Sequence, residues 1–175
     1  VEKMGGELEV RSNVGKGTCF DVAIPIEMAT LEETANEDVE VSSELLIVPI
    51  NILVVDDNDI NRLVLASMLE RFNYVPDEAD NGEVAVEMAR AKRYDLIFMD
   101  CAMPVLDGMS ATKIIMQEGL LSKYGRVVAV TANTTAEDKI SCSEAGMADF
   151  LSKPVVQSDV TAQVRTTLNA KSITA

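Results

Sequence analysis

Charged and hydroxyl side chains follow four apolar runs of this sequence, each at the point where the run ends. Asp56 and Asp57 follow ILVV, Asp100 follows LIFM, Thr131 follows VVAV, and Lys153 follows DFLS. Carboxylates bind metal ions or attack electrophiles, whereas a hydroxyl and an ammonium pair with the oxygens of a phosphoryl group. The combination predicts metal-assisted phosphoryl chemistry on a carboxylate.

The three carboxylates predict a site for a hard divalent cation. The runs before them are expected to form neighbouring strands about 4.8 Å apart, so that Asp56, Asp57 and Asp100 converge. Without a cation, mutual repulsion would raise the pKa of at least one of them. The donors are all oxygen and the sequence contains no histidine, which favours Mg²⁺ as the cofactor. We expect Asp100 to be the nucleophile, just past the end of its strand and facing Lys153 and a metal held with Asp57.

Each acid taken singly has a simpler interpretation. An Asp after a strand often forms a turn or caps the N-terminus of a helix. This interpretation leaves the joint pattern unexplained, because two acids, a third acid, a threonine and a lysine each stand at the carboxyl end of a separate predicted strand.

Apolar runs predict the strands that must position these residues. The strongest runs are residues 52–55, 96–99 and 127–130. They are short and wholly apolar, as expected of parallel strands covered on both faces. Weaker strands are predicted at 74–78 and 149–151, and Pro76, which has no N–H to donate, places the first of these at an edge of the sheet.

Helical periodicity separates the predicted strands. The residues that share a face are Ile60, Val64, Met68 and Phe72 in one helix and Val156, Val160, Val164 and Leu168 in the last. Five strand–helix repeats predict an α/β fold with a doubly wound, flavodoxin-like parallel sheet of five strands. With the weak strand at an edge, the strand order is 2-1-3-4-5, and ligands bind beyond the carboxyl ends of the strands.

The first residues predict a hairpin fragment followed by a linker. LEVRS and TCFDVAIPI flank NVGKG, which is the pattern of two strands joined by a glycine turn. A lone hairpin is marginally stable in water, so residues 1–27 are expected to be the trailing edge of another domain. Residues 28–50 are acidic, lack Lys and Arg, and predict an extended linker. The main domain is expected at 51–171 and a tail at 172–175.

Composition limits the partners and the compartment. The formal net charge of −14 argues against nucleic acid and anionic lipid, which both require clustered Lys and Arg. No apolar run approaches the roughly 20 residues of a membrane span and no segment resembles a signal peptide, so a cytoplasmic location without membrane contact is expected. Cys19, Cys101 and Cys142 have no metal-ligand spacing and are expected to be small buried side chains in a reducing compartment.

Residues 51 to about 171 resemble the receiver domain of two-component signalling in the motifs VVDDNDINR, IFMDCAMPVLDG, VAVTANTTAEDK and EAGMADFLSKPV. The resemblance implies that Asp100 accepts a phosphoryl group from a phosphohistidine on another domain. It implies that Asp57 and Asp100 bind Mg²⁺ directly with the backbone carbonyl of Ala102, while Asp56 acts through water. The implied partners are the phosphodonor domain of a histidine kinase and a histidine phosphotransfer protein.

The resemblance also implies a conformational switch. Thr131 and Lys153 would hold the phosphoryl oxygens, Thr131 would move toward them, and Phe150 would turn inward to fill the vacated space. A core aromatic on the last strand is the simpler interpretation of Phe150. An X-Pro bond can be cis at modest cost, and the resemblance implies a cis bond before Pro154 that aims Lys153. Gly108 is expected to turn the loop before its helix, although an ordinary turn glycine fits equally well.

In receivers, which this chain resembles, partners commonly dock at one of two places. One is where the first helix, here predicted at 61–72, meets the edge of the sheet that carries the acids, and the other is the face formed by the fourth helix, fifth strand and fifth helix. Leu65 and Met68 are the candidate contacts, with burial in the core as the alternative. Two other functions stay open. A phosphatase of the haloacid dehalogenase kind would have an acid where this sequence has Ala102, and a receiver-like binding module would never be phosphorylated.

The first residues, MGGELEVRSNVGKGTCFDVAIPI, resemble the last strands of the ATP-binding domain of histidine kinases. In that family a Gly-x-Gly-Thr turn, here Gly15 to Thr18, precedes the final strand. The parent is therefore expected to be a hybrid histidine kinase. This chain lacks the phosphorylated histidine, the asparagine-bearing helix and the glycine-rich ATP lid, so we do not expect it to phosphorylate itself from ATP.

Overall fold

The computed structural model describes residues 7–13, 17–23, 25, 49–132 and 135–172, in two compact units that divide between Leu45 and Leu46. The first unit contains an antiparallel hairpin of β1 (Glu7–Asn13) and β2 (Gly17–Ala23). The predicted N-terminal hairpin is therefore present. Most of the predicted linker, residues 28–48, and residues 173–175 of the predicted tail lie outside the described residues.

The second unit alternates strands and helices along its whole length. In chain order its elements are β3 (Ile52–Val55), α1 (Asp59–Glu70), β4 (Asp77–Ala79), α2 (Gly82–Ala91), β5 (Tyr94–Asp100), α3 (Gly108–Gln117), β6 (Leu121–Thr131), α4 (Ala136–Glu144), β7 (Asp149–Ser152) and α5 (Gln157–Ser172). The five strands pair in parallel in the order β4-β3-β5-β6-β7. This confirms the predicted fold class and the strand order 2-1-3-4-5.

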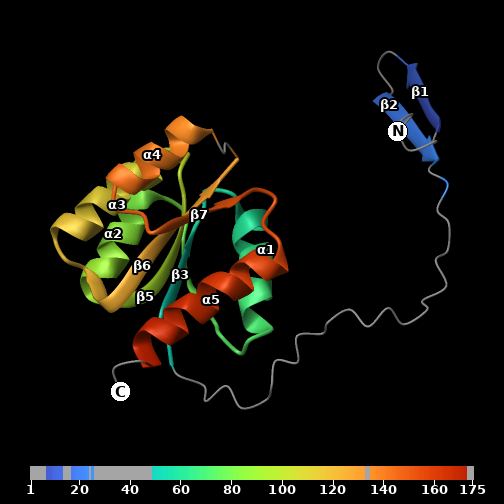
Figure 1. Cartoon of the computed structure of the whole chain (residues 1–175). Coiled ribbons are helices and arrows are strands. Elements are labelled where there is room, and N and C mark those ends of the chain that lie inside the picture. The colour runs from blue at the N-terminus through green and yellow to red at the C-terminus, as the bar shows by residue number, and fades with distance from the viewer. Residues whose placement is uncertain (1–6, 14–16, 24, 26–48, 133–134, 173–175) are drawn as a thin grey trace. The chain divides into compact units, whose positions relative to one another are not determined.

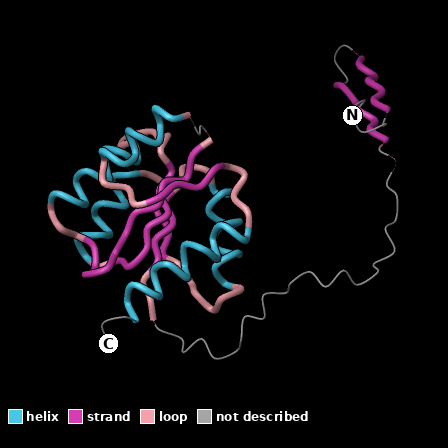
Figure 2. The backbone as a smooth tube through the Cα atoms, viewed as in Figure 1, coloured by secondary structure: helices cyan, strands magenta, loops and turns pink. Residues whose placement is uncertain are grey.

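Helices cover both faces of the sheet. Helices α1 and α5 lie on one face and α2, α3 and α4 on the other (Figure 1). The tube view shows the strands running together between the two layers of helices (Figure 2). None of the helices in the described ranges is both long and apolar enough to cross a membrane.

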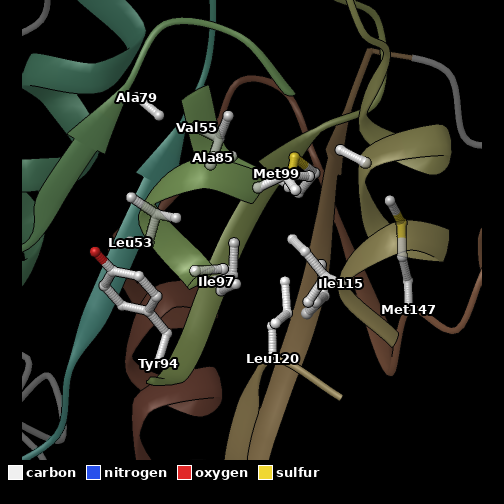
Figure 3. Close-up of a cluster of buried hydrophobic side chains, with 14 of the residues drawn as sticks. Leu53, Val55, Ala79, Ala85, Tyr94, Ile97, Met99, Ile115, Leu120 and Met147 are labelled. Carbon is white, nitrogen blue, oxygen red and sulfur yellow. The ribbon is translucent and has the colours of Figure 1, made fainter. Parts of the chain in front are cut away.

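The core consists of two apolar clusters, one on each face of the sheet. Leu53 and Val55 belong to the cluster that includes Ile115 of α3, whereas Ile52 and Val54 belong to the cluster on the side of α1 and α5. Figure 3 shows the first cluster. Because successive side chains of a strand point to opposite faces, a strand covered on both faces must be apolar throughout. This accounts for the uninterrupted apolar runs of β3 and β5.

Several predicted elements differ in detail; in the last predicted helix, Val156 lies before α5 and is 48% exposed, so it is not part of the buried face. The weak strand is shorter than predicted, because Pro76 precedes β4 rather than lying within it, although β4 is an edge strand as expected. Helix α1 begins at Asp59, two residues before the predicted start, and the predicted face is wrong at its N-terminal end, where Ile60 is 69% and Val64 45% exposed. The buried residues of α1 are Leu65, Ala66 and Leu69.

Candidate active site at the carboxyl ends of the strands

Strand register brings the predicted site residues together. Val55 of β3 pairs with Met99 of β5, so the next residues, Asp56 and Asp100, lie side by side. On the other side of β5, Asp100 itself pairs with Val130, the residue before Thr131. Asp100 is thus the last residue of its strand rather than the first residue beyond it, because its backbone continues the ladder to β6.

Lys153 reaches the same rim from β7. Thr131 pairs with Ser152, the residue before Lys153, and the Lys153 N–H donates to the Thr131 carbonyl at 2.8 Å. The Lys153 ammonium lies 2.7 Å from Oδ2 of Asp56 and 2.7 Å from Oδ2 of Asp100. Lys153 therefore faces Asp100, as the sequence predicted, and it also bridges Asp100 to a second buried carboxylate, Asp56.

Burial sets the electrostatics of this pair. It raises the pKa of Asp100, the charge of Asp56 adds to the rise, and the hydrogen bonds from Lys153 and from the Ala102 N–H, at 3.2 Å, offset only part of it. Burial would lower the pKa of Lys153, but its hydrogen bonds to Asp100 and Asp56 outweigh this and raise it. The ammonium stays charged, and the three acids around it still outnumber it.

The acids form a set of ligands that suits a hard cation. Carboxylate oxygens of Asp56, Asp57 and Asp100 lie within 4.8 Å of one another, with Asp57 exposed and the other two buried. The donors are all oxygen, and an exposed side leaves room for the waters that Mg²⁺ retains. The site thus fits the predicted cofactor, with Asp56, Asp57 and Asp100 as the residues that would hold it.

Three residues that the sequence analysis missed fix Asp56 in place. Asn61 donates from Nδ2 to both carboxylate oxygens of Asp56, at 3.0 and 3.2 Å, and the Asn58 N–H donates to Oδ1 at 2.9 Å. Arg62 donates from Nη1 to the Asp56 carbonyl at 2.7 Å. The sequence signal that could have identified them is Asn58, a residue type typical of helix N-caps. Its side chain accepts a hydrogen bond from the Ile60 N–H, so α1 begins next to Asp56 and its first residues can contact that carboxylate.

A tight loop connects Asp100 to α3. Val105 has φ +70°, and the Leu106 N–H donates to the Pro104 carbonyl at 2.9 Å, which forms a γ-turn. A Cβ on Gly108 would lie 2.0 Å from the Asp100 carbonyl oxygen. Gly108 is therefore needed because α3 begins in contact with the end of β5, a steric reason that differs from both turn-based interpretations made from the sequence.

The predicted switch residues lie where the sequence placed them. Thr131 ends β6 and is half-buried, and Phe150 is a half-buried residue of β7 that packs against the first core cluster. The Nζ of Lys139, on α4, lies 4.2 Å from the centre of the Phe150 ring. The bond between Lys153 and Pro154 is cis, as expected. The movement of Thr131 and Phe150 stays a prediction.

A small cleft opens beside the acids on the side of α1. Its volume is about 190 Å³, and its walls include Asp56, Asn61, Val64, Lys153 and Pro154. The lining residues come from β3, α1, β6 and the segment after β7. Asp56 and Lys153 can therefore be approached along the first helix.

Comparisons with known proteins agree with this architecture. Residues 52–165 match the family described as the response regulator receiver domain. The chain is 31% identical over 166 residues to the aerobic respiration control sensor protein ArcB of Escherichia coli, an alignment that covers 94% of this chain and 21% of ArcB. This chain spans about a fifth or less of the length of the first curated relatives that it matches.

Two solved structures are similar in fold and sequence. One is the receiver domain of sensor histidine kinase PA1611 from Pseudomonas aeruginosa, with a magnesium ion in its active site cleft (37% identity, TM-score 0.58, 65% of this chain and 92% of that chain). The other is the receiver domain of the Saccharomyces cerevisiae response regulator Ssk1 in complex with the histidine phosphotransfer protein Ypd1 (34% identity, TM-score 0.59, 64% and 83%). The chain belongs to the response regulator receiver domain family.

Proposed function

We propose that Asp100 is the phosphoacceptor of a phosphorelay. The observation that carries the proposal is the buried Asp100 carboxylate, hydrogen-bonded to Lys153 within a cluster of acids that fits a divalent cation. A buried carboxylate that shares its one lysine with a second acid and lies beside a third is costly to hold, and such an arrangement favours a chemical role over a structural one. Bound Mg²⁺ would supply positive charge to the phosphoryl oxygens during transfer.

The chain's own residues have defined parts in this transfer. An oxygen of the Asp100 carboxylate attacks the phosphorus of a phosphohistidine, the P–N bond breaks, and the electron pair stays with the imidazole nitrogen, which takes up a proton. The Lys153 ammonium forms an ion pair with one phosphoryl oxygen, and the Thr131 hydroxyl donates a hydrogen bond to another. The donor histidine belongs to another domain or protein, because this chain contains none. The acyl phosphate on Asp100 then passes to a second histidine or alters the switch residues.

The proposed partner is a helical histidine phosphotransfer protein that docks on α1. Ile60 and Leu63 are 69% and 65% exposed, and Val64 is 45% exposed beside the cleft. Of the candidates named from the sequence, Leu65 is only 5% exposed and Met68 packs against the core, so both belong to the alternative, core role. An exposed apolar surface next to the acceptor suits a contact with a desolvated centre. The similarity to the receiver of the Ssk1–Ypd1 complex supports the same partner class.

We propose the predicted domain boundaries for the remaining chain. Residues 1–27 would be the end of a kinase ATP-binding domain, 28–50 a linker, and 51–171 the receiver, followed by a tail at 172–175. The hairpin and the alignment with ArcB over 94% of the chain support a hybrid kinase as the parent. The cytoplasmic location expected from the sequence belongs to this proposal.

Incubation with a small phosphodonor tests the acceptor. With Mg²⁺ and phosphoramidate, we expect intact mass to rise by about 80 Da, the mass of one phosphoryl group. The Asp100→Asn variant and a sample with EDTA should show no rise. Asp95→Asn, which removes a buried acid at the opposite end of β5, is the matched control and should be phosphorylated. Absence of the adduct in folded protein would leave the phosphate-independent binding module as the function.

A further inference from the structure

Two cysteines lie in contact beside the proposed acceptor. Cys101 follows Asp100 at the end of β5, Cys142 lies on α4, and their Sγ atoms are 3.7 Å apart. They are separated by 41 residues, so the fold alone brings them together. We propose that these two thiols form a reversible intramolecular disulfide under oxidising conditions, which tethers α4 to the end of β5.

The geometry requires only a small movement. A disulfide bond is about 2.05 Å long, so the two sulfurs must approach by less than about 2 Å. The backbone of Cys101 is held by its N–H, which donates to the Val130 carbonyl at 3.2 Å, and by its carbonyl, which accepts from the Gly108 N–H at 3.3 Å. The approach must therefore come from side-chain rotation and from a shift of α4.

Exposure assigns the order of the reaction. Cys101 is half-buried, whereas Cys142 is buried with 6% of its surface exposed. The Cys101 thiol, after loss of its proton, attacks one sulfur of a small disulfide such as oxidised glutathione and releases one glutathione thiol. Cys142 then loses its proton, attacks the Cys101 sulfur and releases the second. Two protein thiols are oxidised and one glutathione disulfide is reduced to two thiols.

The reaction is expected to be slow. Cys101 is only partly exposed and Cys142 is 6% exposed, so a small disulfide reaches the two sulfurs only infrequently. Cys19 is exposed on β2 and would react first. The expectation from the sequence that all three cysteines are buried is therefore wrong for Cys19.

The tether would join the segments that the proposed function requires to move, and its regulatory effect rests on that function. The bond would close a loop that contains α3 and β6, and therefore Thr131. Helix α4 also carries Lys139, whose ammonium lies over the Phe150 ring. A covalent link from α4 to the residue next to Asp100 restrains both switch residues, so we expect phosphorylation of the oxidised form to be slower.

Intact mass tests the disulfide in the full chain with Cys19→Ser. After prolonged incubation with oxidised glutathione at pH 8.5, we expect a loss of about 2 Da and a linked pair of peptides containing Cys101 and Cys142. Cys142→Ser should stop at a glutathione adduct on Cys101, and Cys101→Ser should show no intramolecular bond. Thiols that stay free in the native protein, while the same treatment links them in urea, would overturn the proposal, as would a stable glutathione adduct on Cys101 in the parent.

A second measurement separates the modification from its effect. The oxidised protein should be phosphorylated by phosphoramidate and Mg²⁺ about fivefold more slowly than the reduced protein, the size of a modest allosteric coupling, and dithiothreitol should restore the rate. An unchanged rate in fully oxidised protein overturns the regulatory role. Failure of the reduced protein to be phosphorylated would instead overturn the proposed function. The mass test for the disulfide would still stand, because it does not require phosphorylation.

Discussion

Lys153 lies between two buried carboxylates, and its charge acts in two opposite ways. It stabilises Asp56 and Asp100 as a pair, with 2.7 Å from its ammonium to an oxygen of each. It also repels any divalent cation that binds the same acids, because the like charges lie within a few ångströms. The same residue is expected to oppose metal binding and to assist phosphoryl transfer.

Replacement of Lys153 by Met separates these two effects. Mg²⁺ should bind the variant more tightly, because a competing positive charge is gone. Phosphorylation by phosphoramidate at saturating Mg²⁺ should slow by about 100-fold, the usual cost of removing one donor to a developing negative charge. Mg²⁺ titration and initial rates from intact mass measure the two effects. A parallel loss of both would show that Lys153 merely supports the folded site.

At the scale of helices and strands, contacts between neighbouring elements fix both ends of β5. At the carboxyl end, Gly108 lets the first turn of α3 contact the Asp100 carbonyl. At the other end, Asp95 accepts hydrogen bonds from the Asn51 N–H at 2.8 Å, the Ser122 hydroxyl at 2.6 Å and the Lys171 ammonium at 3.1 Å. Asp95 thereby joins the starts of β3 and β6 to the end of α5.

A side chain at position 108 should disturb the site more than the rest of the fold. Gly108→Ala must move α3 away from the end of β5, and we expect it to cost about 2 kcal/mol of unfolding free energy and to weaken Mg²⁺ binding. Gly119→Ala is the matched control, because its φ of +61° makes the substitution strained while nothing lies within 4 Å. Denaturant unfolding and Mg²⁺ titration compare the two. Equal Mg²⁺ affinity in both variants would contradict the role given to Gly108.

The Asp95 network predicts a pH dependence of stability. Burial tends to raise the pKa of Asp95, but its hydrogen bonds with Ser122, Asn51 and Lys171 hold it below its ordinary value of 3.8. Its contribution is therefore present above pH 3.8 and is lost as the pH falls through the lower folded-state pKa. Asp95→Asn should cost about 2 kcal/mol of unfolding free energy at pH 7, and the difference from the parent should shrink at pH 3. A difference that is the same at both pH values would contradict this.

The elements also explain what the sequence could and could not predict. The strong runs of β3, β5 and β6 and the weaker strand at β7 identified the sheet, and the parallel register then placed Asp56, Asp100, Thr131 and Lys153 at one edge of it. The helical periodicity predicted α1, but it does not indicate which turns of the helix the sheet covers. The exposure of Ile60, in the first turn, was therefore not predicted. The contact between Cys101 and Cys142 depends on the packing of α4 against β5, which no local spacing records.

At the scale of the receiver, the proposed acceptor and the proposed docking surface on α1 are separate parts that different donors should distinguish. We expect phosphoramidate to need only the acids, Lys153 and a metal, whereas a phosphohistidine protein should also need to contact the exposed apolar residues of α1. The exposed apolar residues of α1 lie beside the cleft, while Ile140, 59% exposed, lies on α4. These two helices represent the two docking faces expected for receivers.

Leu63→Asp should slow phosphorylation by a phosphohistidine domain at least about tenfold, because a charge at a desolvated contact costs more than 1.4 kcal/mol. Its rate with phosphoramidate should be unchanged. Ile140→Asp is the control of equal chemistry on α4. Initial rates with both donors give the result, and a larger loss with Ile140→Asp would move the docking surface to the face of α4, β7 and α5.

The most direct test of the central claim is the position of the acyl phosphate. Borohydride reduces an aspartyl phosphate to homoserine, so peptide mass spectrometry after phosphorylation with Mg²⁺ locates the modified residue. We predict homoserine at position 100 in samples with Mg²⁺ and none in samples with EDTA. Homoserine at position 56 or 57, or unmodified Asp100 in protein that gained a phosphoryl group, would contradict the assignment of Asp100 as the acceptor.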